Sequence, residues 1–313
     1  MRTYKVLYPV FGAEYCKENP LVVGPFTLYN PKVHRQHLLN KYPHSKEILV
    51  AAYDPNPENK KLEELEKRRV KVVIGVSIEA RETKSANEKA LIKLRQFENF
   101  IRFMIGDQEN NYDVGIFNFN EIKYTTGIFL CDETAGSTSS LTGTFEKISL
   151  NKFPINDPKY GHDRLWLMLD KKKPNDLEKR ILSAVTWVGK GLRDEEPARA
   201  FVQYVFALEA LLQLQQDSLV SPSITYAISE MSAFIIAENL ENRLLIEDMV
   251  KRIYKKRSAI AHGGTHEVEA ALLQDALWLV RVLISLLLIN EEFKDIKSID
   301  DLSKWVKKQK YSS

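Results

Sequence analysis

The feature that most constrains the fold is a change of pattern at residues 170–176, which read Asp-Lys-Lys-Lys-Pro-Asn-Asp. Before this segment, short runs of β-branched and aromatic residues alternate with turn residues, as is typical of strands. After it, apolar residues recur every three or four positions, as is typical of helices that bury one face. A charged segment with a proline suits a domain boundary, and Asn175 or Asp176 can cap the helix that follows. The chain is therefore expected to form two domains that join near residue 172.

The N-terminal domain, residues 1–172, is predicted to be α+β. Its expected strands are YKVLYPVF, EILVAAYD, RVKVVIGVSIEA, YDVGIFNF and IKYTTGIFLC. One long helical pattern, residues 85–106, interrupts them, because its apolar residues share one face and a glycine closes it. The apolar residues of that face are Leu91, Leu94, Phe97, Ile101 and Met104. We expect this domain to have a sensing or targeting role.

The C-terminal domain, residues 173–290, is predicted to be an all-α helical bundle. Its expected helices cover residues 175–192, 196–216, 222–238, 241–262 and 267–290. The most apolar stretch, Ala276 to Ile289, is shorter than the roughly 20 residues that a membrane span needs, and Arg281 interrupts it. We therefore expect a buried helix there. Residues 291–313 carry charges of both signs and are expected to form a charged C-terminal tail, as a frayed or surface helix.

The composition argues against some classes of function and location. The net charge of +3 is too small to indicate a polyanion binder by itself, so only a local patch of charge is informative. Cys16 and Cys131 form neither a CxxC pair nor a disulfide framework, which argues against zinc and favours a reducing compartment. The N-terminus lacks the unbroken apolar segment of a signal peptide. We expect a cytoplasmic protein without a metal or other cofactor.

A local patch of positive charge occurs at residues 251–257, where five of the seven residues are basic: Lys251, Arg252, Lys255, Lys256 and Arg257. Such a run is usually the solvated face of a helix, but here a lone histidine and two glycines follow it. Glycine accepts the left-handed conformation that ends a helix, so His262 is predicted to lie in the last turn. There the helix dipole favours the imidazolium and the neighbouring cations oppose it, which suits proton transfer near neutral pH.

Arg257 and His262 are five residues apart, which separates them by about 140° around an ideal helix. They therefore cannot meet side by side over one substrate atom. The simplest composite site has two such helix ends facing each other across a two-fold homodimer, each contributing an arginine and a histidine. Ser258 shares a helix face with His262, and Tyr254 shares one with Arg257, so both are candidates for supporting roles.

The string YKKRSAIAHG at residues 254–263 resembles the signature of the HEPN superfamily (higher eukaryotes and prokaryotes nucleotide-binding). The likeness is strongest to its Apea-like branch, in which Arg-x4-His marks ribonucleases. Upstream, FALEALL at residues 206–212 is similar to the Leu-Glu-x-Leu element of the family's second bundle helix. The resemblance is confined to residues 175–290, where the helix lengths also fit the family's bundle.

The resemblance implies a HEPN-like bundle that acts as a metal-independent endoribonuclease. His262 would transfer protons and Arg257 would hold the scissile phosphate, and attack by the 2′-hydroxyl would leave a 2′,3′-cyclic phosphate. Similar proteins are often effectors of bacteriophage defence or toxin–antitoxin systems that act on transfer RNA, which also implies an antitoxin or regulatory partner. The other basic residues of the patch would bind RNA: Lys251, Arg252, Lys255 and Lys256.

Glu209 lies on an apolar helix face, where an unpaired carboxylate would cost several kcal/mol, so it should have a partner. The candidates are Arg257, or the backbone and Ser258 at the active helix end. Arg281, within ALWLVRVLISLLLI, raises the same question. It is expected to be the partner of Glu209, a residue of the dimer interface or a second phosphate contact.

Two competing functions use the same residues differently. A catalytically silent HEPN-type module would bind RNA or a partner protein through the basic patch without turnover. A buried His262, or one that points away from a dimer cleft, would favour this module. A protein linked to nucleotidyl transfer would need a carboxylate pair for magnesium, and no convincing Asp-x-Asp follows a Gly-Ser turn in the N-terminal domain.

Other chemically suggestive residues have simpler interpretations. His34, His37 and His44 approach the ligand count of a metal site, but they occur in a loop-like segment and are expected to be surface or structural residues. Residues 136–143 are rich in hydroxyl groups but lack a nucleophile elbow or a Walker lysine, so we expect a flexible hairpin loop. Trp166 and Trp187 lie on apolar runs and are expected to be core residues.

Overall fold

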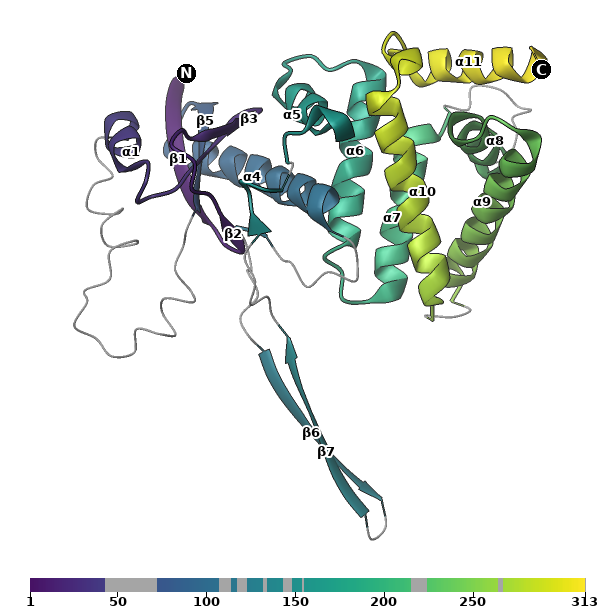
Figure 1. Cartoon of the computed structure of the whole chain (residues 1–313), viewed down its shortest axis with the longest axis horizontal. Helices are drawn as coiled ribbons and strands as arrows, with labels where there is room; N and C mark the ends of the chain where they lie inside the picture. The colour runs from purple at the N-terminus through teal and green to yellow at the C-terminus, as the bar shows by residue number, and fades with distance from the viewer. Residues whose placement is uncertain are drawn as a thin grey trace. The chain divides into compact units, whose positions relative to one another are not determined.

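The structure is a computed structural model of the whole chain. It describes residues 1–42, 72–106, 114–116, 148–153, 155–214, 224–263 and 267–312, together with the backbone of residues 123–131 and 134–142. The chain divides into two compact units (Figure 1). The first comprises Met1–Glu98 and Ile105–Ile155, and the second comprises Asn99–Met104 and Asn156–Ser313.

The first unit contains a four-stranded antiparallel sheet with the order β1-β5-β4-β3. Its strands are β1 (Arg2–Val10), β3 (Leu21–Val23), β4 (Phe26–Tyr29) and β5 (Val72–Ala80). β1 pairs with β5 along its whole length, from Arg2 opposite Ala80 to Val10 opposite Val72. β5 begins with the run VVIGV, and all five residues are buried. A run without polar residues at alternate positions is typical of a strand that is covered on both faces.

Two helices supply apolar groups to the first unit. In α4 (Thr83–Ile105) Leu94 and Phe97 are buried, and the ring of Phe97 meets that of Phe26 edge-on. These residues confirm the predicted apolar face of this helix. In α1 (Arg35–Lys41) Leu38 is buried in one cluster with Tyr29 and Tyr42.

Two further strand pairs complete the described part of the first unit. β2 (Ala13–Glu14) pairs in parallel with β8 (Ile148–Ser149), and β6 (Lys123–Cys131) pairs antiparallel with β7 (Thr134–Thr142). The expectation of a loop at residues 136–143 is wrong for residues 136–142, because their backbone belongs to β7 and pairs with β6. The expected strand YDVGIFNF is reduced, in its described residues 114–116, to one bridge between Gly115 and Phe11. The expected strand EILVAAYD lies outside the described residues.

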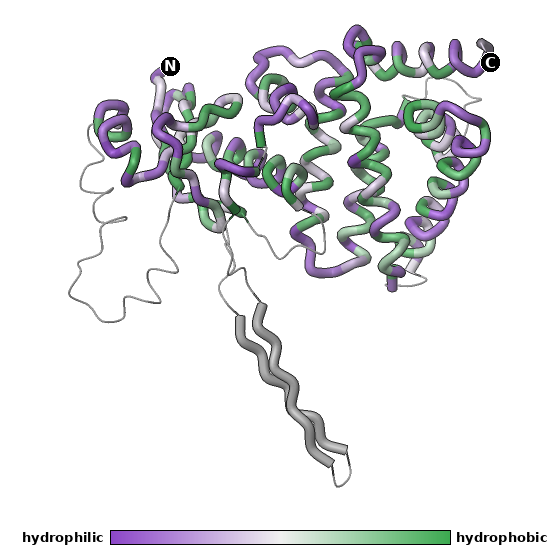
Figure 2. The backbone as a smooth tube through the Cα atoms, viewed as in Figure 1, coloured by the Kyte–Doolittle hydropathy of each residue, from purple (hydrophilic) through white to green (hydrophobic). Residues whose placement is uncertain are grey.

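The second unit is helical, as predicted for the C-terminal region. Its helices are α5 (His162–Asp170), α6 (Asp176–Gly191), α7 (Pro197–Leu212), α8 (Ile224–Ile236), α9 (Leu240–Ala261), α10 (Ala270–Ile289) and α11 (Ile299–Tyr311). α6 packs along α7 and α8 along α9, while α10 contacts α6, α7, α8 and α9. α7 and α10 are mainly hydrophobic, and α9 mixes hydrophobic with strongly hydrophilic residues (Figure 2).

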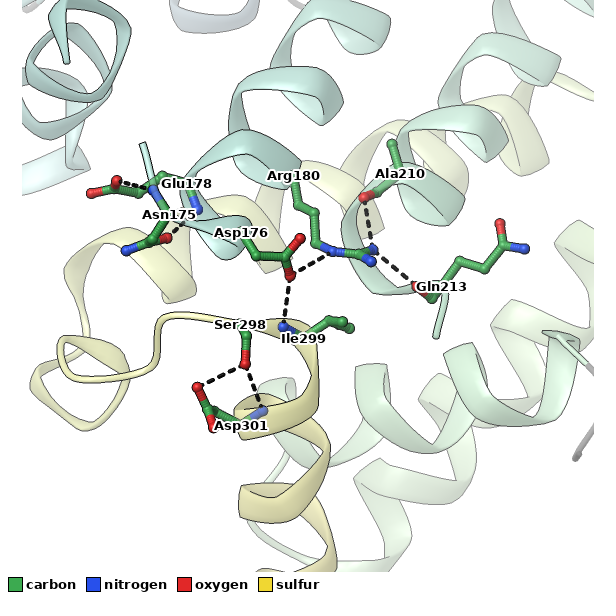
Figure 3. A network of polar contacts seen from close by, with 9 residues as sticks. All are labelled: Asn175, Asp176, Glu178, Arg180, Ala210, Gln213, Ser298, Ile299 and Asp301. Carbon is green, nitrogen blue, oxygen red and sulfur yellow. Dashed lines mark hydrogen bonds and ion pairs between the residues drawn. The ribbon is translucent and has the colours of Figure 1, made fainter. Parts of the chain in front are cut away.

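Polar contacts at the start of α6 hold the ends of neighbouring helices (Figure 3). Asn175 caps α6 in a reciprocal capping box with Glu178, which confirms Asn175 as the predicted cap. Asp176 accepts hydrogen bonds from Arg180 at 3.1 Å and from the backbone N–H of Ile299, at the start of α11, at 3.0 Å. Arg180 also donates to the carbonyl of Gln213, just after α7, at 2.9 Å.

The boundaries of the second unit differ from the expected domain boundaries at residues 172 and 290. α5 belongs to this unit because Leu165 and Trp166 are buried in it, and the Trp166 ring lies 5.6 Å from that of Phe100. The charged segment 170–173 therefore only links α5 to α6. Of the two expectations for residues 291–313, the surface helix is confirmed and the frayed tail is wrong, because α11 packs on α8 and buries apolar residues spaced three or four apart: Ile299, Leu302 and Val306.

Among the described residues, α10 is the one helix that is long and apolar enough to cross a membrane by length and composition. Half of that apolar window is buried inside the structure. Core helices of soluble proteins pass the same test, and the buried side of α10 packs on α6, α7 and α8.

Replacing Gly189 by Ala should destabilise the bundle. A Cβ atom at Gly189 would lie 2.3 Å from the backbone oxygen of Asn99 in α4, closer than any real contact, so the backbone would have to move. We expect a loss of about 1–3 kcal/mol in the free energy of unfolding, measured by urea denaturation. Ser183→Ala, at an exposed position of the same helix, is the matched control and should change stability by less than about 0.5 kcal/mol. Equal effects of the two changes would show that the close contact with Asn99 does not constrain the packing.

Candidate functional site

The candidate site lies at the C-terminal end of α9. The helix ends at Ala261, with His262 as its C-cap, and Gly263 adopts a positive φ of 77°. The backbone N–H of His262 still donates to the carbonyl of Ser258 at 3.1 Å, so His262 belongs to the last turn. The predicted helix end, with glycine directly after the histidine, is confirmed.

The two sides of α9 have different environments. Ile253 and Tyr254 are buried, and Arg257 is half-buried on the same side. The opposite side is open to solvent and carries Lys251, Lys255, Ser258 and His262, all of them exposed. Within one chain the structure therefore keeps Arg257 and His262 on different sides of the helix, as their spacing predicts.

Arg257 forms an ion pair with Glu209 of α7. The guanidinium Nη2 lies 3.6 Å from Oε1 of the carboxylate, and the side chains are 36% and 18% exposed. Burial raises the pKa of the Glu209 carboxyl above its ordinary value, and the positive charge of Arg257 opposes that shift in part. Of the partners expected for Glu209, Arg257 is therefore the one observed. Arg281 instead has its guanidinium 5.8 Å from the ring of Phe103.

Tyr254 lies one turn before Arg257 and is only 9% exposed. Its hydroxyl is buried and has no hydrogen-bond partner among the described residues. Burial raises the pKa of the Tyr254 phenol, the charge of Glu209 raises it further, and the charge of Arg257 lowers it. Glu209, Tyr254 and Arg257 are therefore within electrostatic reach of one another.

The other basic residues of the patch divide into two kinds. Lys251 lies 3.4 Å from Glu247 and 3.5 Å from Asp248, and Arg252 lies 3.5 Å from Asp275 of α10. Lys255 and Lys256 have no acidic partner within 4.0 Å in the part of the chain that the structure describes. Sequence reasoning missed Asp275, because nothing in the spacing along the chain shows that α10 brings it to Arg252.

The histidines that were expected to be surface or structural residues have those environments where the structure describes them. His34 is fully buried, where its Nδ1 accepts from the backbone N–H of Asn30 at 2.8 Å, so its Nε2 donates to the carbonyl of Lys17 at 2.9 Å. Among the described residues, no group of three or more His, Cys, Asp or Glu could hold a metal ion. His37 is exposed, and His44 lies outside the described residues.

The two tryptophans differ from each other. Trp166 is a core residue with 1% exposure, as predicted. Trp187 is only half-buried, because it lies on the outer part of α6, where its ring packs edge-on against Phe206 and the ammonium of Lys190 lies 4.1 Å above it.

Comparison with known proteins gave no relative: no family model, curated protein or solved structure matches the chain. The assignment of function therefore depends on the residues at the end of α9 and on the resemblance of their sequence to the HEPN signature.

Replacing Glu209 by Gln should change the free energy of unfolding in a pH-dependent way. Because the pKa of Glu209 is raised in the folded protein, the folded state retains a proton that the unfolded chain has lost. The contribution of this carboxyl to stability therefore falls as pH rises from the unfolded pKa to the folded pKa. Urea denaturation at several values between about pH 4 and pH 8 should show Glu209→Gln gaining stability relative to wild type across that window. A relative loss of stability with rising pH would contradict the assignment.

Proposed function

We propose that this protein is an endoribonuclease that cleaves RNA without a metal ion, at a site formed by the α9 ends of two copies of the chain. The observation that carries the proposal is the end of α9, where a partly exposed arginine and an exposed histidine occupy the last two turns. Arg257 is held by Glu209 from the neighbouring helix, which limits its freedom before substrate binds. This gives the site a cation that is held near the helix end until a phosphate binds, and an exposed imidazole for proton transfer.

The chemistry needs only these two residue types. One imidazole removes the proton of the 2′-hydroxyl, whose oxygen attacks the adjacent phosphorus. The bond from phosphorus to the 5′-oxygen breaks, and the same imidazole, now protonated, donates that proton to the departing oxygen. The guanidinium of Arg257 stabilises the additional charge on the non-bridging oxygens. The products are a 2′,3′-cyclic phosphate and a 5′-hydroxyl end, and DNA is not cut because it lacks the nucleophile.

The positions of the two side chains on α9 support a homodimer as part of the proposal. Since Arg257 faces α7 and His262 faces solvent, one chain does not supply both groups to the same phosphate. Two helix ends related by a two-fold axis bring the histidine of one copy to the arginine of the other. Lys255 and Lys256, which have no acidic partner among the described residues, would then contact the RNA backbone beside the site.

The biological role is proposed from the resemblance to HEPN proteins. It suggests a growth-arresting effector of defence or toxin type that acts in the cytoplasm, with transfer RNA as substrate and with an antitoxin or other regulatory partner. The first unit would then sense the trigger or direct the enzyme to its target.

The second candidate is a silent HEPN-type module that binds RNA or a protein. The observation that favours it is the ion pair between Arg257 and Glu209, because a guanidinium that is held by a carboxylate is less available to a phosphate. The exposure of His262 at the helix end favours the enzyme.

Cleavage of a labelled transfer-RNA pool in the presence of EDTA separates the two candidates. Wild type should cut the RNA, and Arg257→Ala and His262→Ala should each lower the rate by about a hundredfold or more, because each removes a group that acts in the transition state. His37→Ala, which removes another exposed histidine, is the matched control and should keep the wild-type rate. Circular dichroism and native mass must show that all four proteins are folded and have the same oligomeric state.

The same assay can also contradict the ribonuclease proposal. RNA that is bound by the wild type and all three variants but cut by none of them would establish the silent module in place of the enzyme.

A further inference from the structure

The hydroxyl of Tyr254 is the feature that the proposed chemistry leaves unexplained. It is buried without a hydrogen-bond partner among the described residues. A buried hydroxyl that makes no hydrogen bond costs free energy, and phenylalanine would fill the same space without that cost. Such a group is therefore expected to gain a partner in another state of the protein.

The neighbours of Tyr254 indicate which partner that is. Tyr254 lies one turn before Arg257 on the inward side of α9, and Arg257 lies 3.6 Å from Glu209, so the carboxylate faces the same part of the bundle as the phenol. The charge of Glu209 also raises the pKa of the phenol, and a carboxylate accepts several hydrogen bonds. In this structure Glu209 attracts Arg257 instead, across 3.6 Å, which is beyond normal hydrogen-bond length. The pair is thus held by charge and not by a tight bidentate contact, so the guanidinium can leave it.

We propose that Tyr254 is a positioning residue that becomes the hydrogen-bond donor to Glu209 when Arg257 moves from Glu209 to a phosphate. This deepens the proposed function and rests on it for the identity of the phosphate, an RNA backbone group. Arg257 is 36% exposed at the edge of the site, so it can reach a ligand, whereas Tyr254 and Glu209 remain in the interior.

The exchange of partners lowers the free-energy cost of moving Arg257 from Glu209 to a phosphate. If the guanidinium left without a replacement, a carboxylate that is 18% exposed would lose its partner. A phenol that donates to a carboxylate makes a charge-assisted hydrogen bond, which is shorter and stronger than one between neutral groups. Tyr254 would therefore favour phosphate binding by Arg257 without touching the RNA itself.

A thermodynamic cycle tests the exchange without any ligand. In the full-length wild type, Tyr254→Phe should leave the Tm unchanged or raise it slightly, because the hydroxyl has no partner there. In an Arg257→Met background, where Glu209 has lost its cation, the same change should lower the Tm by about 2–4 °C, because the hydroxyl has become its partner. Ser232→Ala removes another buried hydroxyl without a partner and should have the same effect in both backgrounds.

Binding of RNA provides the second test and does not require the Arg257 variant to fold. The probe is a transfer-RNA fragment with 2′-O-methyl groups, which cannot be cut. Tyr254→Phe should weaken its binding about tenfold, and in a Glu209→Gln background it should have little effect, because Arg257 is then free already. Ser232→Ala should not change the affinity.

The outcomes separate this inference from the proposed function. A Tyr254→Phe effect on Tm that is equal in both backgrounds, or an affinity loss that persists in the Glu209→Gln background, would overturn the exchange. If the wild type does not bind the RNA fragment, the ribonuclease proposal fails, and the Tm cycle alone decides whether Tyr254 replaces Arg257.

Discussion

Helix α7 buries one face that includes Leu208 and Leu211, and the side chain of Glu209 on the same helix is only 18% exposed. A charge in that position needs an opposite charge, and the structure supplies it from Arg257 of α9. This ion pair lies on the side of α9 that also buries Ile246, Val250 and Ile253, and together they set which side of the helix faces the bundle. The opposite side, with Lys251, Lys255 and His262, is consequently left to solvent at the place where the proposed chemistry occurs.

The rest of the second unit keeps this pair in place. The first turn of α6 holds the end of α7 through Arg180 and the start of α11 through Asp176, so the helix that carries Glu209 is fixed at its C-terminal end (Figure 3). The polar groups of the site itself are less completely paired. The ion pair is long and the hydroxyl of Tyr254 is left without a partner, and such local costs are typical of functional sites within otherwise consistent folds.

The sequence predicted the features that depend on local chemistry. Gly263 ends α9, Asn175 caps α6, and Glu209 has a charged partner, because backbone conformation, capping and burial of charge act over short distances. Features that depend on tertiary packing were missed. The membership of α5 in the second unit and the pairing of Asp275 with Arg252 result from contacts between residues distant in sequence, for which spacing carries no signal.

Mixing two inactive variants tests whether the site is shared between the two copies of a homodimer. Arg257→Ala and His262→Ala proteins would be combined in equal amounts, allowed to exchange subunits, and assayed for RNA cleavage in EDTA. If the site is composite, the mixture should regain up to about a quarter of the wild-type rate, because half of the dimers are mixed and each of these has one complete site of two. A mixture that remains as inactive as its parents, although native mass spectrometry shows mixed dimers, would contradict a composite site.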